Sequence, residues 1–245
     1  MNSNINKKKV AVVTGASSGI GLGVTRTLLD EGYQVAANSR NISKSKDLKP
    51  SADLVLVDGD ISKKETAFKV VQTAVERFGR VDLLVNCAGI YFSKAFTDYT
   101  EEDFETMIRV NVAGYFYVTQ QAVAEMRKQK SGHVVSIATT LTEQPLAGEQ
   151  IVLSVIVKST IPAFSRALAM EYLADGIRAN TISPGVVDTP MHANDDLEIL
   201  KKLSPMHRLV QVSEMVDALL FLESAPSVNG ENIRVDGGAH AGAKW

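Results

Sequence analysis

The sequence predicts an α/β protein in which one parallel sheet of seven strands carries helices on both faces. Two observations support this prediction: short apolar runs alternate with longer segments of helical periodicity, and the apolar runs are almost continuous. Strands buried on both faces have this continuous pattern, and strand–helix alternation is typical of doubly wound parallel sheets. The predicted strands cover residues 10–14, 34–38, 54–57, 82–85, 133–137, 178–182 and 233–235.

Helical segments are predicted between these strands. In one of them, apolar residues recur at spacings of three and four and give a single apolar face; they are Phe104, Met107, Ile108, Val112, Tyr115 and Phe116. The weakest pattern lies at residues 190–205, which we expect to form a mobile flap over the site. The predicted helices cover residues 20–31, 64–78, 102–128, 153–172 and 213–222.

The chain is expected to fold as a single domain over residues 9–245, after a disordered tail at residues 1–8. A length of 245 residues is ordinary for one α/β domain, and no linker or internal repeat divides the sequence. The first residues, M-N-S-N-I-N-K-K-K, are polar and basic, which is typical of an unstructured terminus.

Composition excludes several classes of partner. The 26 basic and 28 acidic residues give no basic field for nucleic acid. Scanning for uninterrupted apolar residues finds no segment near the ~18 residues of a membrane span, so no membrane partner is expected. The single cysteine, Cys87, forms no internal disulfide and fits a cytoplasmic protein. No histidine pairs with cysteine at metal-ligand spacing, so no metal site is expected.

A glycine-rich turn follows the first predicted strand and opens the first predicted helix, reading T-G-A-S-S-G-I-G at residues 14–21. Glycines in this context allow a tight turn and a close approach of backbone to phosphate. Free N–H groups at the helix start then face a pyrophosphate. The residues predicted to hold the dinucleotide here are Gly15, Ser17, Ser18, Gly19, Ile20 and Gly21.

The end of the second predicted strand indicates which dinucleotide is preferred. An NAD site places a carboxylate there for the ribose hydroxyls. This chain instead has Ser39 followed by Arg40. A guanidinium can pair with a 2′-phosphate in a charge-assisted hydrogen bond, so we predict NADP(H). The alternative is that Arg40 is a solvated loop residue.

Further motifs follow downstream: N-C-A-G at residues 86–89, the isolated Asn111, Lys158, S-P-G at residues 183–185, and Thr189. Together with the glycine turn, they resemble the short-chain dehydrogenase/reductases over nearly the whole chain. The resemblance implies a Rossmann-type, doubly wound fold. It also implies that Asp60 and Ile61 contact adenine. The same resemblance assigns Asn86, Ala88 and Gly89 to the adenosine ribose side, and Pro184, Gly185, Val187 and Thr189 to the nicotinamide carboxamide.

The resemblance also implies a catalytic set. In the family a tyrosine gives a proton to a carbonyl, a lysine lowers the tyrosine pKa and binds the nicotinamide ribose, a serine orients the carbonyl, and an asparagine holds a water. Asn111 and Lys158 match two of these positions. Thr139 matches the serine, with Thr140 as a one-residue alternative, and a threonine retains the hydroxyl.

The tyrosine of the family motif Y-x-x-x-K is missing. Ser154 stands four residues before Lys158, and no tyrosine occurs between Tyr117 and Tyr172. Loss of a positioned general acid commonly lowers the rate by ~10²–10⁴. Lys158 could donate a proton through Ser154 and a water instead. Tyr91, which follows N-C-A-G-I near the substrate pocket, and Tyr115 and Tyr117, which lie on the predicted helix of Asn111, could each replace the missing phenol, although a core or surface position is favoured for all three.

The run at residues 151–157, I-V-L-S-V-I-V, is apolar and mostly β-branched. It is expected either to build an apolar wall for bulky substrates or to pack against the core or a neighbouring subunit. The sequence thus predicts an NADPH-dependent reductase of ketones or keto esters, with an apolar small-molecule carbonyl or alcohol as substrate. The alternative is an NADP(H)-binding pseudoenzyme that acts as a sensor or scaffold. Family members are commonly tetramers, so a homotetramer is expected.

Overall fold

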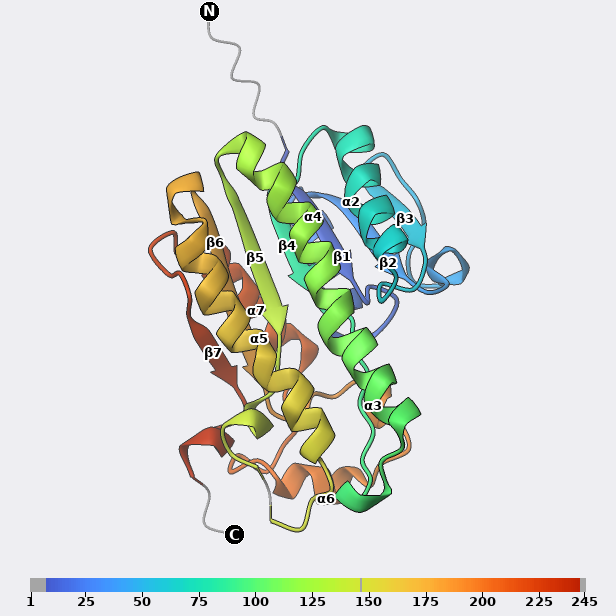
Figure 1. The fold of residues 1–245 in the computed structure, drawn as a ribbon, viewed down its shortest axis with the longest axis vertical. Coiled ribbons are helices and arrows are strands. Elements are labelled where there is room, and N and C mark those ends of the chain that lie inside the picture. The colour runs from blue at the N-terminus through green and yellow to red at the C-terminus, as the bar shows by residue number, and fades with distance from the viewer. Residues whose placement is uncertain (1–7, 146, 243–245) are drawn as a thin grey trace, which may run out of the picture.

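A computed structural model of the protein describes residues 8–145 and 147–242 and contains a seven-stranded parallel sheet, as the sequence predicts (Figure 1). The strand order across the sheet is β3-β2-β1-β4-β5-β6-β7. The chain leaves β1 toward one edge and continues from β4 toward the other, so its direction reverses between β1 and β4. The strands are β1 (Val10–Thr14), β2 (Gln34–Ser39), β3 (Leu54–Asp58), β4 (Leu83–Asn86), β5 (Gly132–Ile137), β6 (Ile177–Pro184) and β7 (Asn232–Val235).

Helices cover both faces of the sheet, and alternate residues of each strand serve the two resulting cores. In β1, Ala11 and Val13 pack toward α1 and α7, whereas Val10 and Val12 pack toward α2 and α4. Figure 1 shows α2, α4 and α5 on one face and α7 behind the sheet. The helices are α1 (Gly19–Asp30), α2 (Lys64–Phe78), α3 (Glu101–Ile108), α4 (Gly114–Gln129), α5 (Val152–Glu171), α6 (Leu197–Lys202) and α7 (Val212–Ser224).

The helix predicted at residues 102–128 is not one regular helix. A π-helical turn over Arg109–Ala113 separates α3 from α4, and it contains Asn111. A π turn accommodates an additional residue within an otherwise α-helical segment and occurs frequently at functional sites. The predicted single apolar face is therefore divided: Met107 and Tyr115 are buried, while Phe104 and Phe116 remain exposed.

Two further boundaries differ from the prediction. Asp82 was expected in the fourth strand, but it precedes β4 and its carboxylate accepts a 2.8 Å hydrogen bond from the backbone N–H of Val10. The weakly patterned segment at residues 190–205 contains α6, which begins because the Asp196 carboxylate caps the N–H groups of Glu198 and Ile199. Its mobility stays a prediction.

Helix α5 corrects the expectation that no segment is long and apolar enough to cross a membrane. It passes that test by length and composition. The scan for uninterrupted apolar residues missed it because Lys158 and Arg166 interrupt the run. In the structure the helix packs on the sheet beside β6 and buries Leu153, Val157 and Leu168. A core helix passes the same test, so the finding is weak support for a span.

The extent of the domain stays a prediction. Of the predicted N-terminal tail, residues 1–7 lie outside the described part of the chain. Lys8 is described, and its ammonium pairs with the Asp53 carboxylate at 2.7 Å.

Candidate active site

A pocket of about 700 Å³ lies at the carboxyl ends of the strands. In open α/β sheets, ligands bind at this edge, where the strand order reverses. Most of the predicted site residues line this pocket. They are Gly15, Ser17, Ser18, Gly19, Ile20, Gly21, Ser39, Arg40, Asp60, Ile61, Ala88, Gly89, Thr139, Ser154, Lys158, Pro184, Gly185, Val187 and Thr189.

The glycine turn has no room for side chains. Gly15 has a φ of +66°, and a Cβ there would lie 2.8 Å from the Ala88 nitrogen. A Cβ on Gly21 would lie 2.3 Å from the Gly15 carbonyl oxygen. Ser18 precedes the first turn of α1, and its side chain does not cap the helix. This leaves the backbone N–H groups at the start of α1 for a ligand, so the cradle fits a pyrophosphate.

The segment after β6 closes over the same turn. The side chain of Thr189 approaches to 3.1 Å from the Cβ position of Gly19, which has a φ of +51°. Val187 is held by a parallel bridge to Val210. The segment predicted to hold a carboxamide therefore lies directly beside the segment predicted to hold phosphates.

The edge of the pocket at β2 and β3 carries one exposed cation, Arg40. Ser39 precedes it as the last residue of β2. Burial raises the pKa of the nearby Asp60 carboxyl, but the hydrogen bonds from Ser62 and the charges of Lys63 and Arg40 outweigh it, and the pKa falls below its usual value. No ion pair of the Arg40 guanidinium occurs among the described residues.

Two predicted residues, Asn86 and Asn111, lie behind the pocket wall at a second, much smaller cavity. Asn111 is 2% exposed, and its Oδ1 accepts from the backbone N–H of Ile90 at 3.1 Å. Its Nδ2 donates to the Met107 carbonyl at 3.2 Å. Asn86 donates to the hydroxyls of Thr119 and Ser136. Both amides thus fix the shape of the wall.

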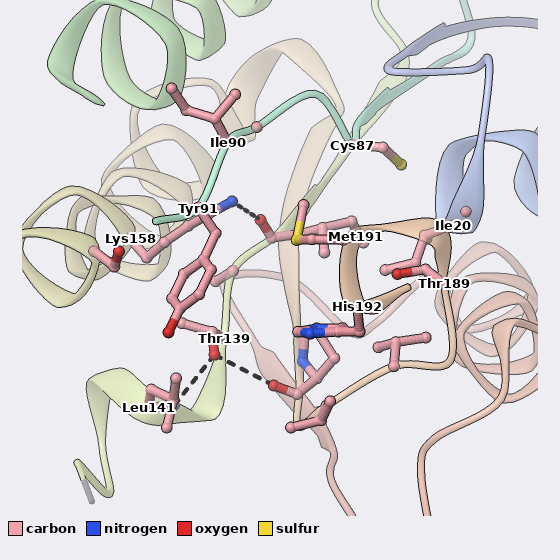
Figure 2. A pocket seen from close by; sticks show the side chains of 18 of the residues that line it. Ile20, Cys87, Ile90, Tyr91, Thr139, Leu141, Lys158, Thr189, Met191 and His192 are labelled. Carbon is pink, nitrogen blue, oxygen red and sulfur yellow. Dashed lines mark hydrogen bonds between the residues drawn. The ribbon is translucent and has the colours of Figure 1, made fainter. Parts of the chain in front are cut away.

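Lys158 connects the wall to the pocket. Its Nζ donates to the Ile137 carbonyl at 3.3 Å (Figure 2). A Cβ on Gly89 would lie 3.0 Å from this Nζ and 2.9 Å from Asn111 Oδ1, so only glycine leaves room for both groups. Burial lowers the pKa of the Lys158 ammonium to about 8, with Cys87 acting in the opposite direction. An amine with this pKa can donate a proton near neutral pH.

The two candidate threonines differ in their surroundings. Thr139 is half-buried and faces the pocket in Figure 2; its hydroxyl accepts from the Leu141 N–H at 3.3 Å and donates to the Pro184 carbonyl at a long 3.5 Å. Thr140 is 4% exposed and its hydroxyl donates to the Pro184 carbonyl at 3.3 Å. Thr139 is therefore the better placed of the two to contact a ligand.

Ser154, at the position of the missing tyrosine, directs its proton elsewhere. Its hydroxyl is buried and donates to the Phe92 carbonyl oxygen at 3.2 Å. A hydroxyl in this geometry must break that bond before it can pass a proton to a ligand. The arrangement therefore favours a route for the proton that does not use Ser154.

The apolar run at residues 151–157 combines both expected roles. Ile151 and Val155 line the pocket. Leu153 and Val157 pack against Met107 in a small core. The remaining members, Val152 and Ile156, are 44% and 45% exposed.

Among the pocket-lining residues outside the predicted site set, His192 and Tyr91 carry side chains that can exchange a proton. His192 was interpreted as a surface or core-edge residue, yet it lines the pocket, where its Nδ1 lies 2.7 Å from the Asp195 carboxylate. Tyr91, interpreted chiefly as core or surface, also lines the pocket and is labelled beside Thr139 in Figure 2. Neither residue follows a helical or strand pattern, because loop geometry alone places them.

Cys87 lines the pocket without the properties of a nucleophile. Burial raises the pKa of its thiol to about 12, and the charge of Lys158 only partly offsets this. The thiol is therefore protonated at neutral pH, and thiolate rather than thiol is the reactive form.

Comparison with known proteins agrees with this geometry. Residues 15–240 match the family described as Enoyl-(Acyl carrier protein) reductase. The chain is 32% identical over 233 residues to an uncharacterized oxidoreductase of Staphylococcus epidermidis, covering 93% of this chain and 97% of that protein.

Solved structures show the same architecture. ElxO with NADP bound has a TM-score of 0.88 and 25% identity, over 96% of this chain and 100% of its own. The 3-ketoacyl-(acyl-carrier-protein) reductase from Brucella melitensis, complexed with NADH, also has a TM-score of 0.88 and 25% identity, over 95% of this chain and 98% of its own. The similar proteins are thus oxidoreductases, and one carries NADP while another carries NADH.

Proposed function

Since the chain belongs to the short-chain dehydrogenase/reductase family, we propose that it is an NADPH-dependent reductase of ketones or keto esters. One observation carries this proposal: the glycine cradle, Thr139 and the buried amine of Lys158 all open onto the same pocket. Ile151, Val155 and Val187 give the pocket apolar walls, which suit an apolar substrate.

The cofactor preference rests on Arg40. The glycine turn supplies backbone donors for a pyrophosphate, as it does for NAD and NADP alike. Ser39 supplies no carboxylate against a 2′-phosphate, and the exposed guanidinium of Arg40 is free to pair with one. When bound there, the nicotinamide supplies the hydride. Lys158 and the segment from Pro184 to Thr189 would hold its end of the cofactor.

The chain's own residues then manage the proton. The Thr139 hydroxyl polarises the carbonyl oxygen of the substrate. The Lys158 ammonium is the proton source, because its pKa of about 8 brings it close to neutral pH. Asn111 accepts a hydrogen bond from the Ile90 backbone and thereby fixes the part of the pocket wall that lies against the Lys158 amine.

The test is NADPH oxidation by the purified protein across a panel of small and bulky ketones, with Lys158→Ala measured in parallel. We expect turnover in the wild type and a loss of about 10²–10⁴ in kcat for the variant. Lys64→Ala, which removes an exposed lysine at the start of α2, is the matched control and should retain full turnover. Equal rates in Lys158→Ala and wild type would contradict the proposed role of the amine.

A second function is favoured by one observation, the hydrogen bond from Ser154 to the Phe92 carbonyl. A chain with an intact cofactor cradle and no proton donor at this position fits an NADP(H)-binding pseudoenzyme that acts as a sensor or scaffold. NADPH binding without turnover, persisting after Ser154→Tyr restores the phenol, would select this function over the reductase.

For the assembly we propose a cytoplasmic homotetramer that packs through α4 and α5. These helices meet through aromatic side chains, with the Tyr115 and Phe164 rings 4.9 Å apart at an edge-to-face angle. Phe116, Ile156 and Met170 remain 43%, 45% and 70% exposed on the same pair of helices. Exposed apolar side chains on a pair of packed helices are what a subunit interface would cover. A monomeric mass in light scattering would contradict the proposal.

A further inference from the structure

Tyr91 is the tyrosine that the fold brings to the pocket. All six tyrosines of the chain lie in its described part, and of these only Tyr91 is among the residues that line the pocket. Figure 2 shows its ring pointing into the pocket, on the side where Thr139 and Lys158 are labelled. The residue is 42% exposed and is therefore accessible to a ligand in the pocket.

Several other tyrosines have hydroxyls engaged elsewhere. Tyr115 lies 3.5 Å from the Ser165 hydroxyl and is 8% exposed. Tyr33 donates to the Glu223 carboxylate at 2.7 Å. Tyr99 donates to the Gln150 carbonyl at 3.3 Å.

The loop that carries Tyr91 is fixed on both sides. Just before it, the backbone N–H of Ile90 donates to Asn111 Oδ1 at 3.1 Å. After it, the backbone N–H of Lys94 donates to the Gln150 carbonyl at 3.1 Å and contacts the Tyr99 hydroxyl at 3.2 Å. These contacts restrain the backbone that carries the ring before substrate arrives, and a restrained backbone helps to preorganise a group that acts on a developing charge.

The phenol is in its protonated form at neutral pH. Burial raises the pKa of Tyr91, the negative charge of Glu149 acts in the same direction, and a side-chain hydrogen bond with Ser93 only partly offsets them. It therefore acts as a hydrogen-bond donor toward a carbonyl oxygen.

We infer that Tyr91 is a catalytic residue, whose phenol donates a hydrogen bond and then its proton to the carbonyl oxygen of the substrate. This inference rests on the proposed reductase function and assigns its proton donor. As the carbonyl carbon gains a hydride from NADPH, the π pair of the C=O bond moves to oxygen. That oxygen takes the phenolic proton, and the product is the alcohol. The remaining phenolate regains a proton from the Lys158 ammonium through pocket water, and solvent recharges the lysine.

The donor is thus supplied from the loop after β4 rather than from α5, where Ser154 stands. Thr139 and Tyr91 would offer two hydroxyl donors to one carbonyl oxygen, and Lys158 would serve as the proton reservoir. Asn111 becomes a positioning residue in this arrangement, since it holds the backbone next to Tyr91.

The test compares Tyr91→Phe with the wild type in kcat, KM and NADPH affinity. We expect kcat to fall by about 10²-fold or more, while the NADPH Kd stays within about twofold because the ring and the cofactor cradle are unchanged. Tyr117→Phe removes a phenolic oxygen from α4, away from the pocket, and is the matched control. The second variant, Ser154→Tyr in the Tyr91→Phe background, is expected to restore turnover by supplying a phenol from α5.

The outcomes separate the two proposals. Wild-type turnover that is unchanged in Tyr91→Phe overturns the assignment of Tyr91 and leaves the reductase function standing. A wild type that binds NADPH but reduces no carbonyl in the panel overturns the reductase function, and the Tyr91 assignment with it.

Discussion

The two halves of the pocket differ in how they are built. The cofactor half, around the turn from β1 to α1, is built of backbone groups and glycines, and its predicted glycines Gly15, Gly19 and Gly21 all line the pocket. The catalytic half, around β5 and α5, depends on side-chain hydroxyls and amines, and here Ser154 and Thr139 replace the expected types. A backbone cradle constrains the sequence strictly because no side chain fits. A proton donor can be supplied from any element that reaches the same oxygen, so its sequence position is less constrained.

The largest effect is expected from breaking the cofactor half with Gly21→Ala. The new Cβ would lie 2.3 Å from a backbone oxygen of the same turn, which cannot move away as a side chain could. Overpacking of this kind costs about 1–3 kcal/mol, and because the strain falls on the cradle we expect NADPH affinity to fall by about 10²-fold. Fluorescence titration of NADPH measures the loss. Gly32→Ala is the control for backbone strain away from the cradle: its φ of +83° strains an alanine although a Cβ there meets nothing within 4 Å, so NADPH affinity should not change.

In the catalytic half, the rate of carbonyl reduction should depend on pH through the Lys158 amine. With a Lys158 pKa of about 8, the ammonium is lost as pH rises through that value. The kcat for reduction should then fall by about tenfold for each pH unit above it, whereas alcohol oxidation should gain. Initial rates of NADPH oxidation across this range provide the measurement. A profile that stays flat through pH 8 would separate the lysine from proton transfer.

At the edge of the cofactor half, Arg40→Ala tests whether this arginine selects NADPH over NADH. We expect NADPH affinity to drop by about tenfold, since one charge-assisted hydrogen bond at an exposed site is lost. NADH affinity should not change, because NADH has no 2′-phosphate. Paired titrations of the two cofactors, with Arg77→Ala on α2 as the control, make the measurement. A loss of equal size for NADH would show that Arg40 does not discriminate between them.

The smallest effect is expected from Ser154→Ala. Its hydroxyl donates to the Phe92 carbonyl, so its removal should lower the free energy of unfolding by about 1 kcal/mol. Because that proton is directed away from the substrate, kcat should stay within about twofold of the wild type. Thermal melting and steady-state kinetics on one preparation give both values. A loss of kcat comparable to that of Lys158→Ala would contradict this prediction and show that Ser154 takes part in proton transfer.

Most of the fold could be predicted from the sequence, because strands buried on both faces leave continuous apolar runs and glycine turns require specific residues. The strand predicted at residues 10–14 coincides with β1, and α1 begins at Gly19 within the predicted turn. The π turn could not be predicted, because the apolar spacing around Met107 and Tyr115 suits a regular α-helix equally well. Both α3 and the π turn pack against α5, and a tertiary contact of this kind is not encoded in the local spacing.

The site residues also differ in how far the sequence could predict them. Residues of the glycine turn were identified because their chemistry is local. Asn111 was identified by its motif, but its position behind the wall was not, since that depends on the π turn. Tyr91 and His192 reach the pocket from irregular loops, whose conformation no periodicity encodes.

The π turn also sets the rotational phase between two helices. In an α-helix each residue advances by about 100° around the axis, so one additional residue in the turn rotates everything on its N-terminal side by that angle relative to α4. On either side of the turn, Met107 packs with Leu153 and Val157 of α5, whereas Val118 packs in the core between α4 and the sheet. Deleting a single residue within Arg109–Ala113 would bring α3 and α4 into one continuous phase and turn Met107 away from α5. The length of the segment Arg109–Ala113 therefore fixes the orientation of α3 relative to α4, whichever side chains the segment carries.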